Sequence, residues 1–97
     1  MNVVLCQAIR ERRIVRFYYD GGTRDVEPHC HGCSKDENDL LRGYQIGGHS
    51  TSGESAGWKM FRLDRVSGLT LTTARFAGPR PDYDSDDNRM ATTYCCL

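Results

Sequence analysis

The sequence predicts a mainly β-strand domain that begins with one short helix. The first observation is that the apolar residues near the start, Val4, Leu5, Ala8 and Ile9, follow the spacing of one helical face. The second is that, from residue 14 onward, β-branched and aromatic residues occur in short runs separated by turn sequences. The third is size, because 97 residues, of which 38% are hydrophobic and 27% charged, suit one small domain with a single core.

Each expected element follows from a local pattern. The helix covers about 2–12, and the turn sequence Asp20-Gly21-Gly22 separates the first two strands because glycine supplies the positive φ of a tight hairpin. Pro28 has no amide hydrogen to donate, so we expect the second strand to end there. The expected strands are 14–19, 23–27, 40–46, 58–66 and a short segment around Leu69 and Leu71.

The C-terminal part differs in composition from the rest. Prolines and aspartates after Phe76 interrupt any regular pattern, so we expect a domain over 1–75 and an extended acidic tail over 76–97. The small antiparallel sheet is expected to curl into a barrel that hides its edge strands. The formal net charge is zero, but the body is mildly basic, which suits an anionic partner or a tail folded over its own basic face. The aspartates of the tail are Asp82, Asp84, Asp86 and Asp87.

The apolar runs and the cysteines indicate the cellular compartment that we expect for the protein. No apolar run approaches the ~20 residues of a membrane span, and the start lacks the length and cleavage pattern of a secretory signal. We therefore expect no membrane contact and a cytoplasmic location. The five cysteines are odd in number, and Cys95 and Cys96 are adjacent, which does not suit a secreted disulfide scaffold. We expect all of them to be reduced thiols.

The stretch from Gly48 to Ser55, GHSTSGES, has the spacing of a phosphate-binding loop, but Glu54 stands where that loop carries lysine. A glutamate repels phosphate, and this loop joins two expected strands instead of a strand and a helix. A nucleophile elbow is also excluded, because Ser52 stands where its second glycine belongs. We expect a flexible hairpin loop here. No nucleophile–base pair or carboxylate pair stands out in the chain, so we do not expect an enzyme.

The stretch PHCHGC at 28–33 raises the question of a zinc site. Structural zinc needs four ligands, commonly as two close pairs, and the second pair would have to come from Cys95 and Cys96 or from His49. Only half of a zinc signature is therefore present. We expect no metal or other cofactor, and a zinc-binding module is kept as an alternative. The ligand-type residues of the stretch are His29, Cys30, His31 and Cys33.

Arginine, tyrosine and histidine side chains could form a basic and aromatic face on the sheet. Arg42 and Tyr44 lie on the same side of the third expected strand, and Arg62 belongs to the neighbouring stretch FRLDRV. Such side chains bind phosphates and stack on bases. The alternative is that the cations are solvated and pair with aspartates such as Asp20 and Asp64. The candidate ligand-binding residues are Arg24, His29, Arg42, Tyr44, Arg62 and Arg65.

The order of several short motifs resembles a WYL domain over about residues 4–72. The most specific of these motifs are A-I-x-x-R leading to F-x-Y at 8–19, R-x-V-x-P at 24–28 and F-R-L-D-R-[IV] at 61–66. The stretches E-P-H and R-G-Y-Q and the tail after Phe76 resemble compact bacterial members of the family. The namesake Trp-Tyr-Leu stands here as Asp-Leu-Leu at 39–41.

The resemblance implies an Sm-like small β-barrel with a leading helix that serves as a ligand-sensing module, often attached to a helix-turn-helix domain in bacterial transcription regulators. It also implies a nucleotide or single-stranded nucleic acid as ligand. Residues 1–12 have room for one short helix, so we expect no helix-turn-helix and an output through a protein partner or a homodimer. The alternative is a protein-interaction module that uses exposed strand edges and binds no small ligand. The implied contacts are Arg24, Tyr44, Arg62 and Arg65.

Overall fold

The protein is mainly β-strand with one N-terminal helix, as the sequence predicts. The computed structural model describes residues 1–51, 53, 54 and 56–97. No helix in this described part of the chain is long and apolar enough to cross a membrane. The elements are α1 (Val3–Glu11), β1 (Arg13–Tyr19), β2 (Gly22–Cys33), β3 (Asp39–Gly48), β4 (Gly57–Arg62), the 3-10 turn η1 (Leu63–Arg65), β5 (Ser67–Arg75) and β6 (Thr92–Cys96).

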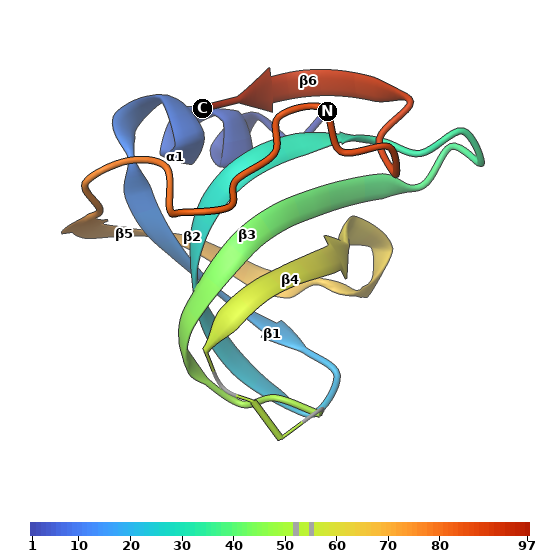
Figure 1. The fold of residues 1–97 in the computed structure, drawn as a ribbon. Coiled ribbons are helices and arrows are strands. Elements are labelled where there is room, and N and C mark those ends of the chain that lie inside the picture. Colours follow the sequence, from blue (N-terminus) through green and yellow to red (C-terminus); the bar gives the residue numbers. More distant parts are fainter. Residues whose placement is uncertain (52, 55) are drawn as a thin grey trace.

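The strands form one antiparallel sheet in the order β4-β3-β2-β1-β5. β2 extends past the end of β1, and β6 pairs with this protruding part. Figure 1 shows the strongly curved strands β2 and β3, with α1 and β6 at the upper end of the molecule. The turn η1 joins the edge strands β4 and β5, but no pairing between these two strands occurs among the described residues. The sheet is therefore open, and the expected barrel is not confirmed.

The local sequence explains where α1 begins and ends. The Asn2 side chain accepts a hydrogen bond from the Leu5 amide at 3.0 Å, which satisfies one free amide of the first turn. At the other end Arg12 adopts a left-handed conformation, and its amide donates to the carbonyl oxygens of Ala8 and Ile9. The helix so defined buries Leu5, Ala8 and Ile9, the apolar residues whose spacing predicts it.

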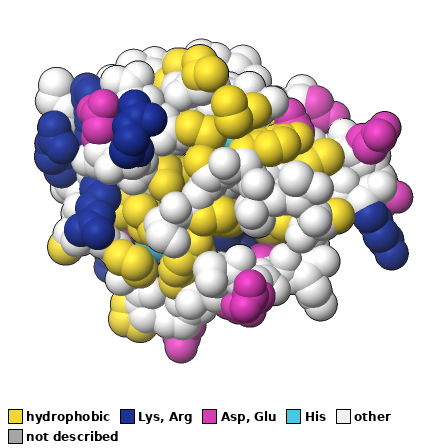
Figure 2. Space-filling model, turned by 90° about the horizontal axis from the view of Figure 1, so that it is seen from above, with side chains coloured by type: hydrophobic (Ala, Val, Ile, Leu, Met, Phe, Trp, Pro, Cys, Tyr) yellow, Lys and Arg dark blue, Asp and Glu magenta, His cyan; other side chains and the backbone are white. Residues whose placement is uncertain are grey.

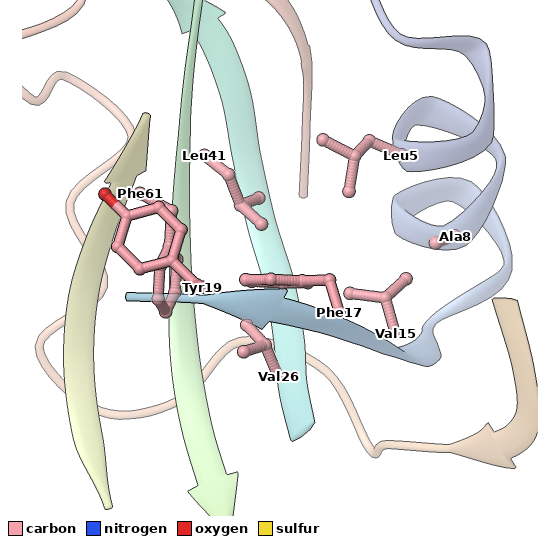
Figure 3. Packing of buried hydrophobic residues seen from close by; sticks show 8 residues of the cluster. All are labelled: Leu5, Ala8, Val15, Phe17, Tyr19, Val26, Leu41 and Phe61. Carbon is pink, nitrogen blue, oxygen red and sulfur yellow. The ribbon is translucent and has the colours of Figure 1, made fainter. Parts of the chain in front are cut away.

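The core lies between α1 and the inner face of the sheet (Figure 3). Alternation along β1 points Phe17 and Tyr19 into this core and leaves Arg16 and Tyr18 exposed. The rings of Phe17, Tyr19 and Phe61 meet edge to face, with centroids between 5.0 and 6.3 Å apart. Such ring pairs add about 0.5–1.5 kcal/mol each beyond the burial of apolar area. The buried cluster consists of Leu5, Ala8, Val15, Phe17, Tyr19, Val26, Leu41 and Phe61.

The expected turn joins β1 to β2, but β2 does not end at Pro28. Asp20 and Gly21 have positive φ angles of 42° and 97°, as a two-residue hairpin turn requires. β2 continues through Pro28 to Cys33. The pairing with β1 has ended before Pro28, and the register with β3 shifts between Pro28 and Cys30. A proline is tolerated at such a bulge, where one side of the strand has no neighbour.

The fourth strand is shorter than expected. β4 ends at Arg62, and residues 63–65 form the turn η1. The Arg62 amide donates a hydrogen bond to the Tyr19 hydroxyl at 3.1 Å. At the end of β4 this amide therefore pairs with a side chain. The expected strand over 58–66 is therefore wrong in its last residues, because the chain turns there to enter β5.

The C-terminal region adds a strand that the sequence analysis does not predict. β6 pairs with β2, and Gly32 lies opposite Thr93. Glycine is required at this position because a Cβ would overlap the Thr92 carbonyl oxygen. Residues 76–97 therefore contribute to the same sheet as the rest of the chain. The domain boundary after residue 75 stays a prediction.

The expectation of reduced thiols is wrong for four of the five cysteines. Cys6 of α1 is bonded to Cys95, Cys30 of β2 is bonded to Cys96, and Cys33 is free. Adjacent residues of a strand point to opposite sides, so the two neighbouring cysteines of β6 reach two different partners. Disulfides are typical of oxidising compartments. The cytoplasmic location therefore stays a prediction that this pairing does not favour.

Candidate ligand-binding face

Three of the predicted site residues share one surface of β3 and β4. The register places Arg62, Met60 and Trp58 beside Leu40, Arg42 and Tyr44, in that order. Because side chains alternate along a strand, these residues face away from the buried Leu41 and Phe61. We name this surface the outer face. It consists of Leu40, Arg42 and Tyr44 of β3 and Trp58, Met60 and Arg62 of β4.

A segment of the tail crosses the outer face. We name residues 76–91, which join β5 to β6, the strap. Figure 1 shows the strap as the orange-to-red coil that runs across β2 toward β6. Its Tyr83 ring stacks on Trp58, and its Asp87 carboxylate pairs with Arg42. Of the two arrangements that the charge distribution allows, the structure has the acidic tail folded over the basic face of the same chain.

The covered end of the outer face is an aromatic cluster. The Tyr83 and Trp58 rings are stacked with centroids 6.0 Å apart, and the Tyr44 ring meets Trp58 edge to face at 5.5 Å. The Arg80 guanidinium lies 4.3 Å from the centroid of the Tyr44 ring. It also donates two hydrogen bonds to the Glu27 carboxylate, at 2.8 and 3.0 Å. This bidentate pair neutralises the buried Glu27 and fixes the first part of the strap.

His29, one of the predicted ligand-binding residues, lies beneath this cluster. The residue is 0% exposed. Its Nδ1 donates to the Glu27 carbonyl oxygen at 2.8 Å, so Nε2 is unprotonated and accepts from the Arg80 amide at 3.1 Å. Burial lowers the pKa of His29 by more than the hydrogen bond to Glu27 raises it. Both ring nitrogens are therefore occupied within the protein, in the neutral form of the side chain.

Arg42 is held by the strap. Its guanidinium donates two hydrogen bonds to Oδ2 of Asp87, one of them from Nε at 2.9 Å. Partial burial acts to raise the pKa of Asp87, but hydrogen bonds from the Arg89 amide and from Arg42 outweigh it, and the pKa lies below its ordinary value. The charge of Arg42 is thus already compensated within the chain.

The other end of the outer face is open. A cavity of about 420 Å³ lies between the loop that joins β2 to β3, the end of β4 and the last residues of the strap. Leu40 and Met60 give it an apolar floor, and Asn38 and Asn88 add amide groups to the wall. The volume falls within the range of small-molecule sites, roughly 300–1,000 Å³. The charged residues that line the cavity are Lys35, Asp36, Arg62 and Arg89.

Arg62 lies at the edge of this cavity, and another acceptor can replace its present hydrogen-bond partners. Its guanidinium donates to Oδ1 of Asn38 at 3.3 Å and to Oδ2 of Asp64 at 2.7 Å. Both members of the Arg62–Asp64 pair are exposed, and exposed pairs contribute only about 0–1 kcal/mol. Arg89 is exposed and lies 3.7 Å from Asp87. An anion that enters the cavity can therefore compete for both guanidinium groups at small cost.

Arg24 and Arg65 lie away from the outer face, next to the ring of Tyr19. Each guanidinium carbon is 5.4 Å from the ring centroid. Arg24 is only 3% exposed, and it bonds to the Tyr19 carbonyl oxygen and to Oε1 of Gln45. Arg65 is exposed and pairs with Asp20. The six predicted residues therefore do not all converge on one site, and their contact with a ligand stays a prediction.

Two motifs remain, and neither adds a site among the residues that the structure describes. Ser52 and Ser55 of the GHSTSGES loop lie outside the described residues. In the PHCHGC stretch, Cys30 is bonded to Cys96 and the Cys33 thiol donates to the Ser34 carbonyl oxygen. No group of three His, Cys, Asp or Glu side chains within residues 1–51, 53, 54 and 56–97 could hold a metal ion. The zinc alternative therefore lacks a ligand set in these ranges.

Sequence reasoning missed a basic cluster at the end of α1. Arg12 donates to the Ala77 carbonyl oxygen at 3.0 Å, and Arg75 donates to that of Glu11 at 2.9 Å. Figure 2 shows Lys and Arg side chains gathered at the left edge, the side on which Figure 1 places α1 and the end of β5. The run RERR at 10–13 is the signal that could have found it, although cations are also common at helix C-termini for electrostatic reasons. The cluster consists of Arg10, Arg12, Arg13 and Arg75.

No family model, curated protein or solved structure matches this chain. The WYL resemblance therefore stays a prediction that rests on its sequence motifs.

Proposed function

We propose that the protein is a ligand-sensing module of WYL type that binds a nucleotide or a short single-stranded nucleic acid at the open end of the outer face. The cavity carries this proposal, because its apolar floor lies next to the three cations Lys35, Arg62 and Arg89. A nucleotide has matching chemistry. Its base can cover the apolar floor, and its phosphate can accept hydrogen bonds from a guanidinium group in bidentate geometry.

The electrostatic balance of the cavity favours an anion without making it strongly basic. Phosphate can replace Asp64 as the partner of Arg62, because the present pair is exposed and weak. Asp36 also lines the cavity and opposes an anion. We therefore expect binding that is weak, reversible and reduced by salt, which suits a sensor.

The fold part of the proposal is that the sheet forms an Sm-like barrel. The leading helix, the single antiparallel sheet and the turn η1 between the two edge strands support it. The proposal goes beyond the observed pairing in one respect, because a closed barrel requires β4 to pair with β5. In this proposal the module acts in bacterial transcription regulation in the cytoplasm, and ligand binding changes its self-association or its contact with a protein partner.

The test is a titration of the purified chain with adenosine monophosphate at low salt. Replacing Arg62 by alanine should weaken binding about tenfold to a hundredfold, since a hydrogen bond to a charged group is lost. Arg65→Ala is the matched control, because it removes an equally exposed arginine that does not line the cavity. Its effect should stay below about twofold. Absence of binding to the wild-type protein, or equal losses in both variants, would contradict the proposal.

The second candidate function is protein interaction without a small ligand. In the described part of the chain β4 pairs only with β3 and β5 pairs only with β1, so each strand has one unpaired edge. Such edges can accept a strand from another chain. Sedimentation over a range of concentrations tests this function. A dimer that forms at micromolar concentration, together with no nucleotide binding, would favour it over the first.

A further inference from the structure

The strap is anchored near both of its ends. At the first, Arg80 makes its bidentate pair with the buried Glu27. At the second, Met90 is 8% exposed and packs with Cys30 and Leu40. These two contacts hold the ends of the strap on the sheet independently of the residues between them.

The middle of the strap is held mainly by Tyr83 and Asp87. Within residues 82–87 the side chains of Tyr83 and Asp87 are half-buried and the others are exposed. A cavity of about 200 Å³ remains beneath this stretch, bounded in part by Arg42 and Trp58. Tyr83 stacks on Trp58 and its hydroxyl donates to the His29 carbonyl oxygen at 3.3 Å, while Asp87 pairs with Arg42. The Trp58 indole also donates to the Pro81 carbonyl oxygen at 3.2 Å. Displacement of this stretch has to break these few contacts.

The contacts of Tyr83 and Asp87 resemble those that a nucleotide would make with the outer face. Tyr83 places a ring on Trp58, where a base would stack, and Asp87 places an anion on Arg42, where a phosphate would bind. Arg42 and Arg62 are diagonal neighbours on adjacent strands of the same face, roughly 7–8 Å apart. Two guanidinium groups at this spacing, each on a flexible side chain, can reach phosphates of the same nucleic-acid strand. The strap pairs with Arg42 through Asp87, whereas Arg62 remains at the open cavity.

We propose that residues 82–87 mimic the ligand and cover a second subsite, formed by Arg42, Tyr44 and Trp58, for a base and a phosphate of single-stranded nucleic acid. This inference rests on the proposed function and extends it. A mononucleotide binds in the open cavity without moving the strap, whereas a longer strand continues along the outer face and displaces Tyr83 and Asp87. Arg80 remains on Glu27, so the acidic group at the end of the subsite stays neutralised.

The test compares Asp87→Asn with Asp86→Asn. Asparagine at 87 keeps the size of the side chain and can still accept the hydrogen bond from the Arg89 amide, but it removes the charge that pairs with Arg42. The Asp86 side chain is exposed, so its variant changes the net charge equally without changing that pair. The probes are adenosine monophosphate and an oligothymidylate of about six residues.

Asp87→Asn should raise the affinity for oligothymidylate about fivefold or more, because the competing ion pair is lost. Asp86→Asn should change it less than about twofold. Asp86→Asn should bind adenosine monophosphate with the affinity of the wild-type protein. Asp87→Asn should gain less than about twofold for this probe, because Asp87 lies 3.7 Å from the cavity residue Arg89 and the strap stays in place. Fluorescence gives an independent measure, because Trp58 is the only tryptophan and stacks on Tyr83. Its emission should shift to longer wavelength in Asp87→Asn and should be quenched when oligothymidylate binds.

The outcomes distinguish failure of this inference from failure of the proposed function. Equal oligothymidylate affinities in all three proteins, with unchanged Trp58 emission, would show that the strap is a fixed part of the fold and would overturn this inference, while nucleotide binding would still support the proposed function. No binding of either probe to any of the proteins would overturn both. A synthetic peptide with the sequence of residues 80–89 that binds Asp87→Asn when oligothymidylate does not would overturn the assignment to nucleic acid.

Discussion

The two ends of the outer face lie on the same pair of strands, yet one is covered and the other is open. At the covered end Trp58 and Arg42 are in contact with a ring and a carboxylate of the strap. At the open end Leu40, Met60 and Arg62 border a cavity. The strands continue through both ends in one register. The difference therefore arises from where the strap is anchored. In the proposed function the C-terminal segment determines which part of the face a ligand can reach.

The largest expected effect comes from releasing the strand that follows the strap. Reduction of the two disulfides should lower the free energy of unfolding by about 4 kcal/mol, because Cys6–Cys95 alone closes a loop with a sequence separation of 89. Urea unfolding with and without a reductant measures this loss, and Cys33→Ser is the control because Cys33 is free. Five titratable thiols in the native protein, or identical unfolding curves, would contradict the pairing of β6 with α1 and β2.

The second effect separates buried from exposed arginines among the predicted residues. Replacing Arg24 by leucine should cost about 2–3 kcal/mol of stability, since the Tyr19 carbonyl and the Gln45 side chain lose a buried donor. Arg65→Leu should change stability by less than about 0.5 kcal/mol, because Arg65 is exposed. Thermal and urea unfolding measure both values. A large loss of stability in Arg65→Leu, or none in Arg24→Leu, would contradict the packing around Tyr19.

The third effect is a loss of stability in acid that originates beneath the covered end and beneath β6. His29 and His31 have pKa values that burial lowers below their ordinary value. In each ring Nδ1 donates to a carbonyl oxygen, and Nε2 accepts from the amide of Arg80 or Asn2. A proton on Nε2 would therefore face another donor. Glu27 favours the charged form of His29 and Asp39 favours that of His31, but burial outweighs both.

The sign follows from linkage, since the unfolded chain binds these protons more readily than the folded one. The stability that the neutral rings contribute is complete above a pH of about 6.5 and falls as the pH decreases toward the lower pKa values of the folded protein. The slope should reach about 1.4 kcal/mol per pH unit for each histidine. Urea unfolding from about pH 7.5 to about pH 5 measures it. His31→Gln should flatten the profile, and a profile that stays as steep as that of the wild-type protein would contradict this origin of the acid loss.

The smallest expected effect concerns the open end. Arg89→Ala should weaken binding of adenosine monophosphate only about twofold to fivefold, because this exposed side chain is screened by solvent and lies near Asp87. The same titration that tests Arg62 measures it. A loss as large as that of Arg62→Ala would mean that phosphate binds beside the strap and not beside the end of β4.

Local sequence patterns predict the parts of the molecule that depend on neighbours in the chain. The helical spacing of Leu5 and Ala8 and the alternation in β1 place the core correctly, and alternation also puts Arg42 and Tyr44 on one face of β3. The contacts of residues 76–97 could not be predicted, because they join segments far apart in the chain. The spacing of the cysteines does not indicate which of them pair. The Pro- and Asp-rich composition of the strap does not indicate which distant strand the strap contacts.

His29 shows the same limit at the level of one residue. A histidine after a proline at an expected strand end has the sequence of an exposed rim residue. It is buried because Trp58, Phe76 and Tyr83 close over it, and these side chains come from β4 and from the segment that begins after β5. Arg24 is buried in a similar way, by contact with Tyr19 and Phe61. Burial of a polar side chain by distant residues leaves no local signal.

The measurement that tests the central claim most directly is an NMR titration of the labelled full chain with the oligothymidylate at low salt. The proposed site predicts that the first shifts occur at Leu40, Met60 and Arg62, and that the indole N–H of Trp58 responds at higher occupancy as the strap is displaced. Shifts confined to the basic cluster at the end of α1, Arg10 to Arg13 with Arg75, would contradict the account and would move the binding surface to that end of the molecule.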